Sequence, residues 1–377
     1  MKILHVYRTY YPDAPGGVQE AMRQIALATA VFGVESQMFV LSPSPSPTTL
    51  QRPEGSVVRA HSWVAPASCD LGLLDAFSQF KRLASASDVI HYHFPWPFAD
   101  MLHFAARHGR PTVMTYHSDI VNKGVLGHLY KGLMYRMLAS MDRVVATSHS
   151  YTVSSPVLRS RVSQQQLSVI PLGICEQTYT EPRQAAARID LAERFGLTEG
   201  GYFLFLGALR AYKGLEDLCH AMRDAPFRLV IAGSGRLDER VRQLTEGNPA
   251  VLMTGHVTDA EKMALIHSCR ALVLPSHMRS EAFGMVLVEA SMCSKPLISC
   301  EIGTGTTFVN ADGETGLVVP PGNPQRLRQA LDRLWNEPET AERMGRAARD
   351  RYQRLFSGER LGHAYSELYR QLLTGSA

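Results

Sequence analysis

The chain has 377 residues, 45% hydrophobic and 20% charged, so it is too long for one compact core and too apolar for a disordered protein, and we expect two domains. Its net charge of +4 is too small for a dedicated nucleic-acid binder. No segment approaches the ~18 consecutive apolar residues of a membrane span, and residues 1–7 look like a first strand rather than a signal peptide, so we expect a cytoplasmic protein.

Short β-branched or aromatic runs alternate with amphipathic stretches in the first half of the chain. The predicted strands are KILHVY, ESQMFVLS, DVIHYHF, PTVMTYH and DRVVATS, and a helix is predicted over residues 19–32. This alternation is typical of an open, mostly parallel α/β sheet. Residues 42–53, rich in proline, serine and threonine, are predicted to be a loop.

A turn after the first strand ends with Gly16 and Gly17 and leads into a helix. Backbone N–H groups and the helix dipole can hold an anion there, and a purely structural turn is an equal alternative. The G-x-G-x-x-G pattern followed by an acidic residue is missing, which disfavours a dinucleotide-binding dehydrogenase.

Histidines are frequent in the first half: His91 and His93 share a strand face, and His117 follows the next strand. Together with Asp119 they are a conceivable metal site, but hydrogen bonding to sugar hydroxyls suits them as well. The chain has no Asp-x-Asp pair to hold a cation and a diphosphate, and its six cysteines form no C-x-x-C pair. We therefore expect no metal and no other cofactor.

The excess positive charge lies in residues 1–175, which hold 15 Lys and Arg against 10 Asp and Glu. Within this half, residues 123–143 place apolar side chains at helical spacing beside Lys131 and Arg136. The apolar positions are Val125, Leu126, Leu129, Leu133, Met134, Met137 and Leu138. Such a helix can lie on an anionic membrane, or it can pack on its own sheet with a basic outer face.

A second series of predicted strands begins near Gly201: YFLFLG, FRLVIAGSG, AVLMTGHV, RALVLPS, KPLISCEIG and GLVVP. Helical patterns separate them, and three helices close the chain, the last over residues 358–373. We predict an α/β protein with two Rossmann-like parallel-sheet domains, residues 1–175 and 176–355, followed by a helical segment over 356–377.

Two glycine-containing turns follow the first strands of the second series. Residues 207–214, which begin with Gly207, place Arg210 and Lys213 at the carboxyl end of a strand, where open α/β sheets bind ligands. Fixed cations can stabilise a departing diphosphate without a metal, although two solvated surface cations are the alternative. Ser234 and Gly235 end the next strand, where backbone donors can meet phosphate or sugar oxygens.

The stretch SEAFGMVLVEA, residues 280–290, places Glu281 in a loop and Glu289 on the helix that follows. A hydroxyl-rich ligand needs carboxylate acceptors, and the helix start at Phe283, Gly284 and Met285 offers backbone N–H groups to its oxygens. The alternative is structural, with one capping and one surface glutamate.

Seven stretches together resemble glycosyltransferase family 4, retaining enzymes with the GT-B fold, in which the two domains face each other across a cleft. They are GGVQE, TYHSD, GALRAYKG, GSG, SEAFGMVLVEA, EIGTGTTFVN and GETGLVVPPGNP. The match spans nearly the whole chain. HYHFPWPF, RAYKG and SEAFG with EIGTGT look most similar to bacterial O-antigen mannosyl- and D-rhamnosyltransferases. In relatives of this kind the last helix crosses back to the first domain.

The resemblance implies a role for each matching position. Gly16 and Gly17 would approach the donor diphosphate, His117 would contact the transferred sugar, and Lys213 would neutralise phosphate. Many members carry G-R-x-x-x-x-K-G, whereas position 208 here is alanine, so Arg210 is the candidate for that phosphate contact.

In the second half, Glu281 would bind the sugar near the reacting centre, and Glu289 would hold the ribose hydroxyls. The backbone at Phe283, Gly284 and Met285 would donate to the sugar or the phosphate. The backbone around His256 and Val257, in TGHV, would meet the base.

The implied activity is the metal-independent, retaining transfer of a hexose, D-rhamnose or mannose, from a GDP-sugar. The implied acceptor is a glycan on undecaprenyl diphosphate at the cytoplasmic face of the inner membrane, in O-antigen or lipopolysaccharide synthesis. Two alternatives stay open. A nucleotide-sugar epimerase of the same fold would need no acceptor, and a non-catalytic nucleotide-sugar-binding protein would bind donor without acceptor-dependent release.

Overall fold

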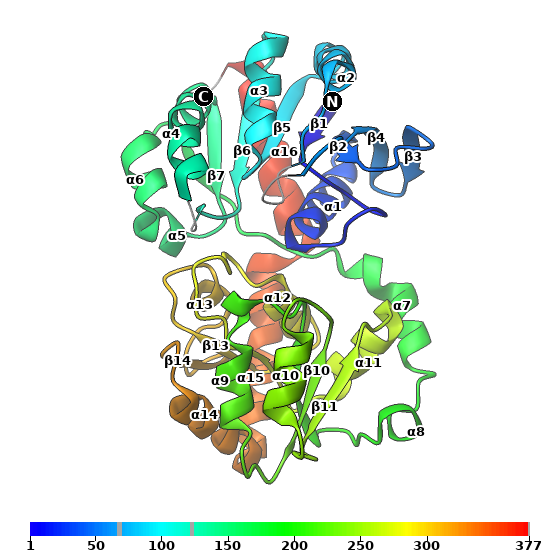
Figure 1. Cartoon of the computed structure of the whole chain (residues 1–377), viewed down its shortest axis with the longest axis vertical. Coiled ribbons are helices and arrows are strands. Elements are labelled where there is room, and N and C mark those ends of the chain that lie inside the picture. The colour runs from blue at the N-terminus through cyan, green and yellow to red at the C-terminus, as the bar shows by residue number, and fades with distance from the viewer. Residues whose placement is uncertain (66–69, 121–123, 376–377) are drawn as a thin grey trace. The chain divides into compact units, whose positions relative to one another are not determined.

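The computed structural model describes residues 1–65, 70–120 and 124–375, which form two compact units (Figure 1). The first unit comprises Met1–Ile174 together with Gly358–Ala377, and the second comprises Cys175–Ser357. The chain therefore leaves the first unit once and returns to it with its last helix.

The sheet of the first unit has the order β3-β4-β2-β1-β5-β6-β7-β8, and all its pairs are parallel except β3 with β4. Its strands are β1 (Lys2–Val6), β2 (Glu35–Ser42), β3 (Thr49–Arg52), β4 (Gly55–His61), β5 (Val89–Phe94), β6 (Thr112–Tyr116), β7 (Arg143–Ala146) and β8 (Leu167–Val169). Every residue of β5 is buried, as expected for a central parallel strand with helices on both faces. The strand order reverses between β1 and β5, which makes this the switch point of the sheet.

The prediction of a loop over residues 42–53 was wrong in part. Strand β3 lies within this segment and pairs antiparallel with β4, Thr49 with Val58 and Arg52 with Gly55. Strand β3 is a short, polar edge strand with no fully buried residue, so it lacks the apolar signal that marks the other strands.

The helices of the first unit connect its strands, except the last, which enters this unit after the second unit. They are α1 (Gly17–Ala30), α2 (Leu74–Ser85), α3 (Pro97–Ala106), α4 (Gly124–Ala139), α5 (His149–Ser154), α6 (Pro156–Arg161) and α16 (Gly358–Thr374). Helix α16 packs against α1. A Cβ added at Gly362 would lie 2.1 Å from the Ala28 carbonyl oxygen, so glycine permits this close approach.

Helix α4 packs on its own unit through the part whose side chains are described. Met134, Met137 and Leu138 are buried there, whereas Arg136 is exposed. The side chains of Val125, Leu126 and Leu129 lie outside the described ones. No helix among the described residues is long and apolar enough to cross a bilayer.

The second unit contains a fully parallel sheet of order β11-β10-β9-β12-β13-β14. Its strands are β9 (Tyr202–Leu206), β10 (Arg228–Ala232), β11 (Val251–Gly255), β12 (Ala271–Leu274), β13 (Leu297–Cys300) and β14 (Gly316–Val319). All six correspond to the predicted runs. The strand order reverses between β9 and β12, so their carboxyl ends flank the switch point of this sheet.

The helices of the second unit surround this sheet. They are α7 (Thr180–Ala186), α8 (Leu191–Phe195), α9 (Leu215–Ala221), α10 (Asp238–Thr245), α11 (Asp259–Ser268), α12 (Met285–Met292), α13 (Thr306–Val309), α14 (Pro324–Asn336) and α15 (Pro338–Arg351), with short turns η2 (Glu176–Tyr179), η3 (Ala211–Lys213) and η4 (Tyr352–Phe356). Helix α11 starts with a capping box between Thr258 and Glu261.

The five described cysteines are buried and free. Burial raises the pKa of Cys219 to about 11 and that of Cys269 to about 12. They are unreactive packing residues, in agreement with the sequence pattern. Cys69 lies outside the described residues.

Candidate functional site

Two loops meet at the switch point of the second unit. One follows β9 and contains the short turn η3, and the other runs from the end of β12 to the start of α12. The amide of His277, in the second loop, donates to the carbonyl of Tyr212 in the first, at 3.0 Å. The sequence element around Arg210 and Lys213 and the element around Glu281 therefore form one site.

At the centre of this site, Lys213 Nζ donates to Glu281 Oε2. Both side chains are about nine-tenths buried, with 11% and 12% of their surface exposed. Burial alone would lower the pKa of Lys213, but the adjacent Glu281 carboxylate raises it above its ordinary value. Ser276 Oγ donates to the same carboxylate oxygen at 3.3 Å. The site thus contains a charged lysine, Lys213, that is paired with the carboxylate of Glu281.

Glycines allow the surrounding loops to approach one another. Gly214 has φ 68°, and a Cβ there would lie 2.0 Å from the carbonyl oxygen of Pro275. Gly233 has φ 137°, and its Cβ would lie 2.1 Å from the carbonyl oxygen of Gly207. A larger residue at either position would clash with backbone, so these glycines set the shape of the site.

The other predicted residues of the first two loops lie at the same edge of the sheet. Arg210, Ser234 and Gly235 are exposed, and the amide of Leu209 bonds the carbonyl of Ser234 at 3.1 Å. Arg210 forms no recorded ion pair within the described part of the chain. It is therefore a cation beside the Lys213–Glu281 pair that can meet an anionic ligand.

Helix α12 begins at this site. Its N-cap residue, Gly284, has φ 81° and provides no side-chain cap, while Phe283 is buried and Met285 is partly exposed. The first N–H groups of a helix have no partner within the helix. This helix start can therefore donate to ligand oxygens, as its sequence suggested.

Glu289 lies on α12 and is 8% exposed. Its Oε1 accepts hydrogen bonds from Tyr179 Oη at 2.7 Å and from Lys262 Nζ at 3.0 Å. Tyr179 and Lys262 did not emerge from the sequence, because they lie 110 and 27 residues away along the chain. Tyr179 and Lys262 thus fix the Glu289 carboxylate, which is largely buried. The alternative that Glu289 is a surface glutamate is wrong.

The backbone of Glu281 is held by the loop after β13. Thr304 Oγ1 donates to the Glu281 carbonyl oxygen at 2.7 Å, and the amide of Gly305 donates to the carbonyl of Ala282, also at 2.7 Å. Thr304 lies in EIGTGTTFVN, which resembled the family but suggested no individual role. The loop after β13 therefore positions the acidic residue.

His256 and Val257 follow β11 at the far edge of the sheet. His256 is exposed and Val257 is partly exposed. Next to them, the carbonyl of Gly255 accepts from the amide of Gly233 at 2.7 Å. This contact joins the TGHV turn to the loop that contains Ser234 and Gly235.

In the first unit, Gly16 and Gly17 are exposed at the start of α1, with no side-chain cap on the helix. A Cβ at Gly17 would meet no atom within 4 Å, whereas one at Gly16 would meet the flexible side chain of Gln19. The helix start is open, and its N–H groups can meet an anion.

His117 follows β6 and is 5% exposed. Its Nε2 lies 2.9 Å from His93 Nδ1, and His93 Nε2 lies 3.1 Å from His5 Nδ1. Burial lowers the pKa of His5 and of His117 to about 3. The rings are therefore uncharged at neutral pH.

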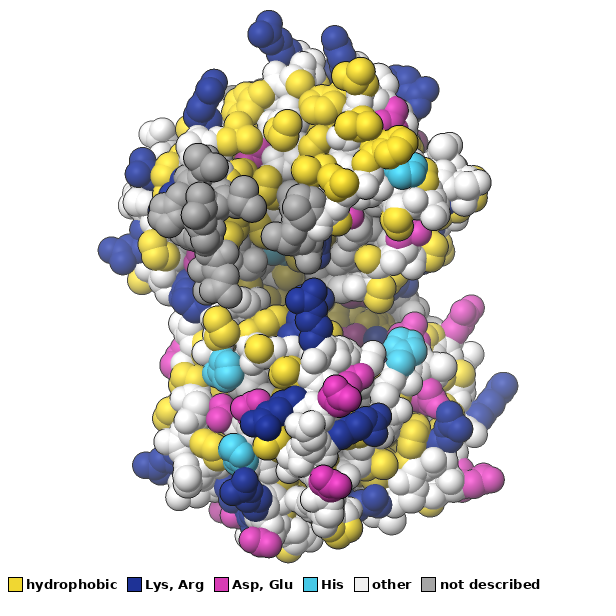
Figure 2. All heavy atoms as spheres, viewed as in Figure 1, with side chains coloured by type: hydrophobic (Ala, Val, Ile, Leu, Met, Phe, Trp, Pro, Cys, Tyr) yellow, Lys and Arg dark blue, Asp and Glu magenta, His cyan; other side chains and the backbone are white. Residues whose placement is uncertain are grey.

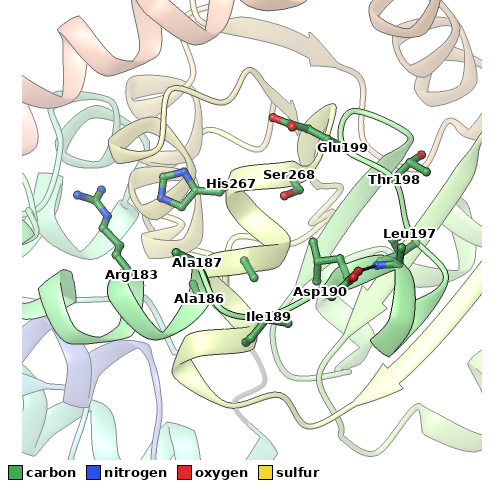
Figure 3. Close-up of a pocket in the computed structure, with 13 residues that line it drawn as sticks. Arg183, Ala186, Ala187, Ile189, Asp190, Leu197, Thr198, Glu199, His267 and Ser268 are labelled. Atoms are coloured by element: carbon green, nitrogen blue, oxygen red, sulfur yellow. Dashed lines mark hydrogen bonds between the residues drawn. The ribbon is translucent and has the colours of Figure 1, made fainter.

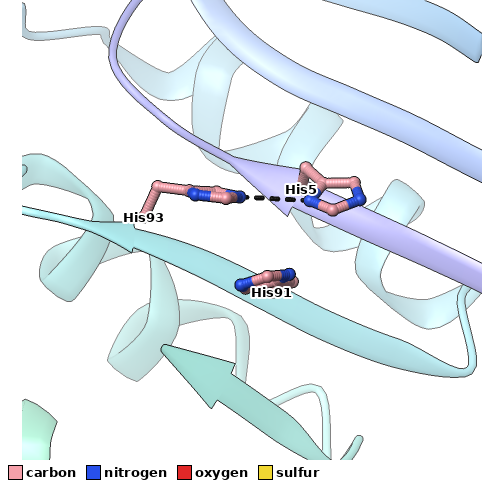
Figure 4. A group of neighbouring side chains, drawn as sticks. All are labelled: His5, His91 and His93. Carbon is pink, nitrogen blue, oxygen red and sulfur yellow. Dashed lines mark hydrogen bonds between the residues drawn. The ribbon is translucent and has the colours of Figure 1, made fainter. Parts of the chain in front are cut away.

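The structure groups the histidines differently from the metal site considered from the sequence. His5, His91 and His93 have ring nitrogens within 4.8 Å of one another (Figure 4). The carboxylate of Asp119 instead accepts from Tyr116 and Ser155, at 3.0 and 2.7 Å. His91 bonds Thr115 Oγ1 and Tyr369 Oη, both at 2.7 Å, so hydrogen bonds already satisfy its two nitrogens.

A hollow of about 660 Å³ lies elsewhere in the second unit, beside α7, α8 and α11 (Figure 3). Its lining includes Thr198 and Glu199, which precede β9, and Ser268, which precedes β12. It therefore lies at the amino edge of the sheet, opposite the loops described above. None of the predicted site residues lines it.

The arrangement at the carboxyl edge suits a phosphorylated, hydroxyl-rich ligand. Lys213, Arg210 and the start of α12 can bind a diphosphate, and Glu281 and Glu289 can accept hydrogen bonds from hydroxyl groups. Cations in a partly buried site stabilise a leaving diphosphate more strongly than they do in water.

Comparisons with known proteins agree with this chemistry. Residues 15–177 match the family described as Glycosyltransferase Family 4, and residues 190–351 match Glycosyl transferases group 1. The chain is 42% identical over 360 residues to the D-rhamnosyltransferase WbpZ of Pseudomonas aeruginosa, covering 95% of this chain and 92% of that protein. It is 40% identical over 359 residues to the O-antigen chain mannosyltransferase C of Escherichia coli, covering 95% of each.

Solved structures show the same fold. Sucrose-phosphate synthase from Thermosynechococcus elongatus is 23% identical and aligns with a TM-score of 0.80 over 99% of both chains. The sequence relatives, both family matches and the two parallel-sheet units lead to one assignment. The chain belongs to glycosyltransferase family 4, has the GT-B fold and is a glycosyltransferase.

Proposed function

We propose that the protein transfers D-rhamnose or mannose from a GDP-sugar to a glycan carried on undecaprenyl diphosphate, in O-antigen synthesis. The observation that carries this proposal is the Lys213–Glu281 pair at the switch point of the second unit. The D-rhamnosyl- and mannosyltransferases at 42% and 40% identity support the choice of sugar and pathway.

The proposed reaction proceeds with retention of configuration and without a metal. The bond between the anomeric carbon and the diphosphate oxygen breaks while the acceptor oxygen bonds the same carbon from the same face. The proton of the acceptor hydroxyl passes to the departing diphosphate. Lys213 and Arg210 stabilise the diphosphate, and Glu281 positions the sugar without forming a covalent bond to it.

The proposed reaction also assigns contacts with the donor to the other candidate residues. Glu289 holds the ribose hydroxyls, and the start of α12 donates to the sugar or the phosphate. The backbone at His256 and Val257 meets the base. In the first unit, the glycines at the start of α1 approach the diphosphate, and His117 contacts the transferred sugar.

A donor panel tests the proposal. Purified protein is incubated with GDP-mannose, GDP-D-rhamnose, UDP-glucose and UDP-galactose, with and without a lipid-linked oligosaccharide, and nucleoside diphosphate release is measured. We expect GDP release that needs the acceptor, and an α-anomer by NMR of the product. Conversion of donor without acceptor would indicate an epimerase, and donor binding without release would indicate a binding protein. Either result would refute transfer.

We further propose that the first unit contacts an anionic membrane, where a lipid-linked acceptor would lie. Five exposed apolar side chains of this unit gather on one face over α2, α3 and the segment after β4 (Figure 2). They are Trp63, Val64, Leu73, Leu74 and Met101. The sequence left membrane contact by α4 as one alternative and packing on its own sheet as the other, and the described apolar residues Met134, Met137 and Leu138 are buried.

Positive charge accompanies the apolar face. Lys81 is exposed on α2 two helical turns after Leu74, on the same side of the helix, and Arg82 is exposed next to it. Apolar residues beside cations are the combination that binds anionic lipid surfaces.

Co-sedimentation with vesicles tests this surface. We expect binding to vesicles that contain phosphatidylglycerol and much weaker binding to pure phosphatidylcholine. The double variant Trp63→Ser, Leu74→Ser should lose binding, while Leu373→Ser, at an exposed leucine on α16, should keep it. Equal binding by both variants, or a stable dimer of the wild type in solution that the double variant abolishes, would rule out the membrane contact.

A further inference from the structure

A line of hydrogen-bonded imidazoles crosses the switch point of the first unit. It starts at Ser36 on β2, passes through His5 on β1 and His93 on β5, and ends at His117 after β6. Strand register puts His5 beside His91, and the two-residue period of β5 puts His93 on the same face. The three rings of the line are at most 5% exposed.

Each ring in this line has one N–H, because all three are uncharged. Burial lowers the pKa of His5 and His117 to about 3, and burial and then the neighbouring histidines lower that of His93 well below its ordinary range. A neutral imidazole donates through one nitrogen and accepts through the other. The protons along the line must therefore all point toward His117 or all point toward Ser36.

The Ser36 end favours one of these directions. Ser36 Oγ lies 3.5 Å from His5 Nε2, at the outer limit of a hydrogen bond. If the protons pointed toward Ser36, His5 would bury an N–H with only this poor acceptor. If they point toward His117, the weak contact leaves only a lone pair poorly satisfied. Buried donors without partners are rarer in proteins than under-satisfied acceptors.

The other end of the line opens toward a ligand. Nε2 of His117 bonds His93, and Nδ1 of His117 has no hydrogen-bond partner among the described residues. His117 is 5% exposed, and its Nδ1 is not fully buried, so a ligand can reach that nitrogen.

We propose that His5 and His93 hold His117 in the tautomer with its proton on Nδ1, so that His117 presents a neutral N–H donor to a substrate oxygen. His5 and His93 are positioning residues, because they act through His117. The substrate contact of His117 rests on the proposed function. The tautomer does not, since it follows from the three hydrogen bonds and the neutrality of the buried rings.

His91 stands outside this line although it stacks on His93, with ring centroids 4.4 Å apart. Its two nitrogens bond Thr115 and Tyr369. A metal held by His5, His91 and His93 would take one nitrogen from each ring, so it would have to break one of the two hydrogen bonds of His91. Hydrogen bonds, within the line or to Thr115 and Tyr369, therefore account for every nitrogen of His5, His91 and His93.

Nitrogen NMR of the full-length protein labelled with ¹⁵N-histidine reads the tautomer directly, because protonated and unprotonated ring nitrogens differ widely in chemical shift. We expect His117 to be protonated on Nδ1, which is the less populated tautomer of free histidine. In His93→Leu, where the donor to Nε2 is gone, the proton should move to Nε2. In His93→Asn, the side-chain amide can replace the donation and should restore Nδ1 protonation.

Transfer kinetics complete the test. We expect kcat to fall roughly fivefold to tenfold in His93→Leu, the effect of one lost hydrogen bond, and to recover in His93→Asn. His363→Asn, at an exposed histidine on α16, serves as the control and should match the wild type.

A wild-type His117 protonated on Nε2 would refute the proposal, even if no variant folded. Ring shifts typical of metal ligation, with one zinc per chain, would refute it too. If the tautomer is as expected but His93→Leu turns over like the wild type, the substrate contact is wrong. A protein with no transfer activity but the expected tautomer would contradict the proposed function and leave the positioning role of His5 and His93 supported.

Discussion

The two units place different chemistry at the switch points of their sheets. In the first unit, β1 and β5 bring buried, uncharged histidines together, among them His5 and His93. In the second, the loops after β9 and β12 bring together a cation and an anion, Lys213 and Glu281. The same topology thus supports a neutral, buried hydrogen-bond network in one unit and a charged, partly accessible ion pair in the other.

This difference indicates separate roles. An ion pair can exchange one partner for a ligand, so a diphosphate can replace Glu281 beside Lys213 and free the carboxylate for sugar hydroxyls. A buried neutral network cannot gain charge without a large desolvation cost, so it keeps its geometry. The second unit is suited to binding a charged donor, and the first to presenting a fixed hydrogen-bond donor.

Removing the anion of the charged site should have the largest effect. We expect Glu281→Ala to lower transfer by roughly 100-fold to 1000-fold while the protein remains folded, because the sugar loses its positioning group. Turnover and a thermal melt measure this. Glu216→Ala breaks the exposed pair with Arg240 in the same unit and should leave turnover unchanged. Near-normal turnover of Glu281→Ala would remove Glu281 from the mechanism.

A methyl group added at Gly362 should disturb the packing of helix α16 against α1. In Gly362→Ala the new Cβ would lie 2.1 Å from the carbonyl oxygen of Ala28, and we expect unfolding to become easier by ~1–3 kcal/mol. Gly132→Ala, on α4 with no atom within 4 Å, should be neutral or slightly stabilising. Equal denaturation midpoints for the two variants would show that α16 does not pack as described.

Mild acid should loosen the first unit before the second. The folded pKa of His5 and His117, about 3, lies below the unfolded value of 6.5, so the unfolded state binds more protons between these values and stability falls as the pH drops through this window. Asp100, whose pKa burial raises to about 7, opposes this, but it is one group against several buried histidines.

The second unit contains a group that responds in the same direction but at lower pH. Burial alone would raise the pKa of Glu176, but hydrogen bonds from Arg349 and Arg183 lower it below 4.5, so its contribution is lost only in stronger acid. Hydrogen exchange by mass spectrometry at pH 6.5 and 5.5, corrected for intrinsic rates, should show roughly tenfold faster exchange in peptides of β1 and β5 and little change in β9 and β12. The same change in both units would contradict this assignment.

The smallest effect should come from Tyr179, which contacts Glu289 in the second unit. Tyr179→Phe removes the 2.7 Å hydrogen bond to Glu289 but leaves Lys262 in place, so we expect the donor KM to rise about fivefold with little change in kcat. Tyr202→Phe loses a buried hydrogen bond to Leu265 in the same unit and should lower stability without changing KM. An unchanged KM in Tyr179→Phe would mean that Glu289 does not depend on Tyr179.

The sequence predicted the elements of the second unit well, because each strand there is a short apolar run that ends at a glycine or proline turn. The sequence also singled out Lys213 and Glu281 as candidates, and the structure pairs them because both follow strands whose carboxyl ends meet at one edge. Strand β3 was missed because its polar edge position removes the hydrophobic pattern on which the prediction depends.

Contacts that depend on strand register or distant packing could not be predicted. His5 joins His93 only because β1 pairs with β5, 88 residues later in the chain. Tyr179 and Lys262 carried no signal in the sequence, and only the fold brings them into contact with Glu289. A single sequence shows which residues follow strands but not which strands are neighbours.

Calorimetric titration of GDP into the protein in the presence of EDTA tests most directly the central claim that fixed cations of the second unit bind the diphosphate without a metal. We expect the wild type to bind GDP with the same affinity with and without EDTA. Lys213→Ala should bind at least tenfold more weakly, and Lys213→Arg should keep part of the affinity. Loss of wild-type binding in EDTA, or unchanged binding by Lys213→Ala, would contradict the account.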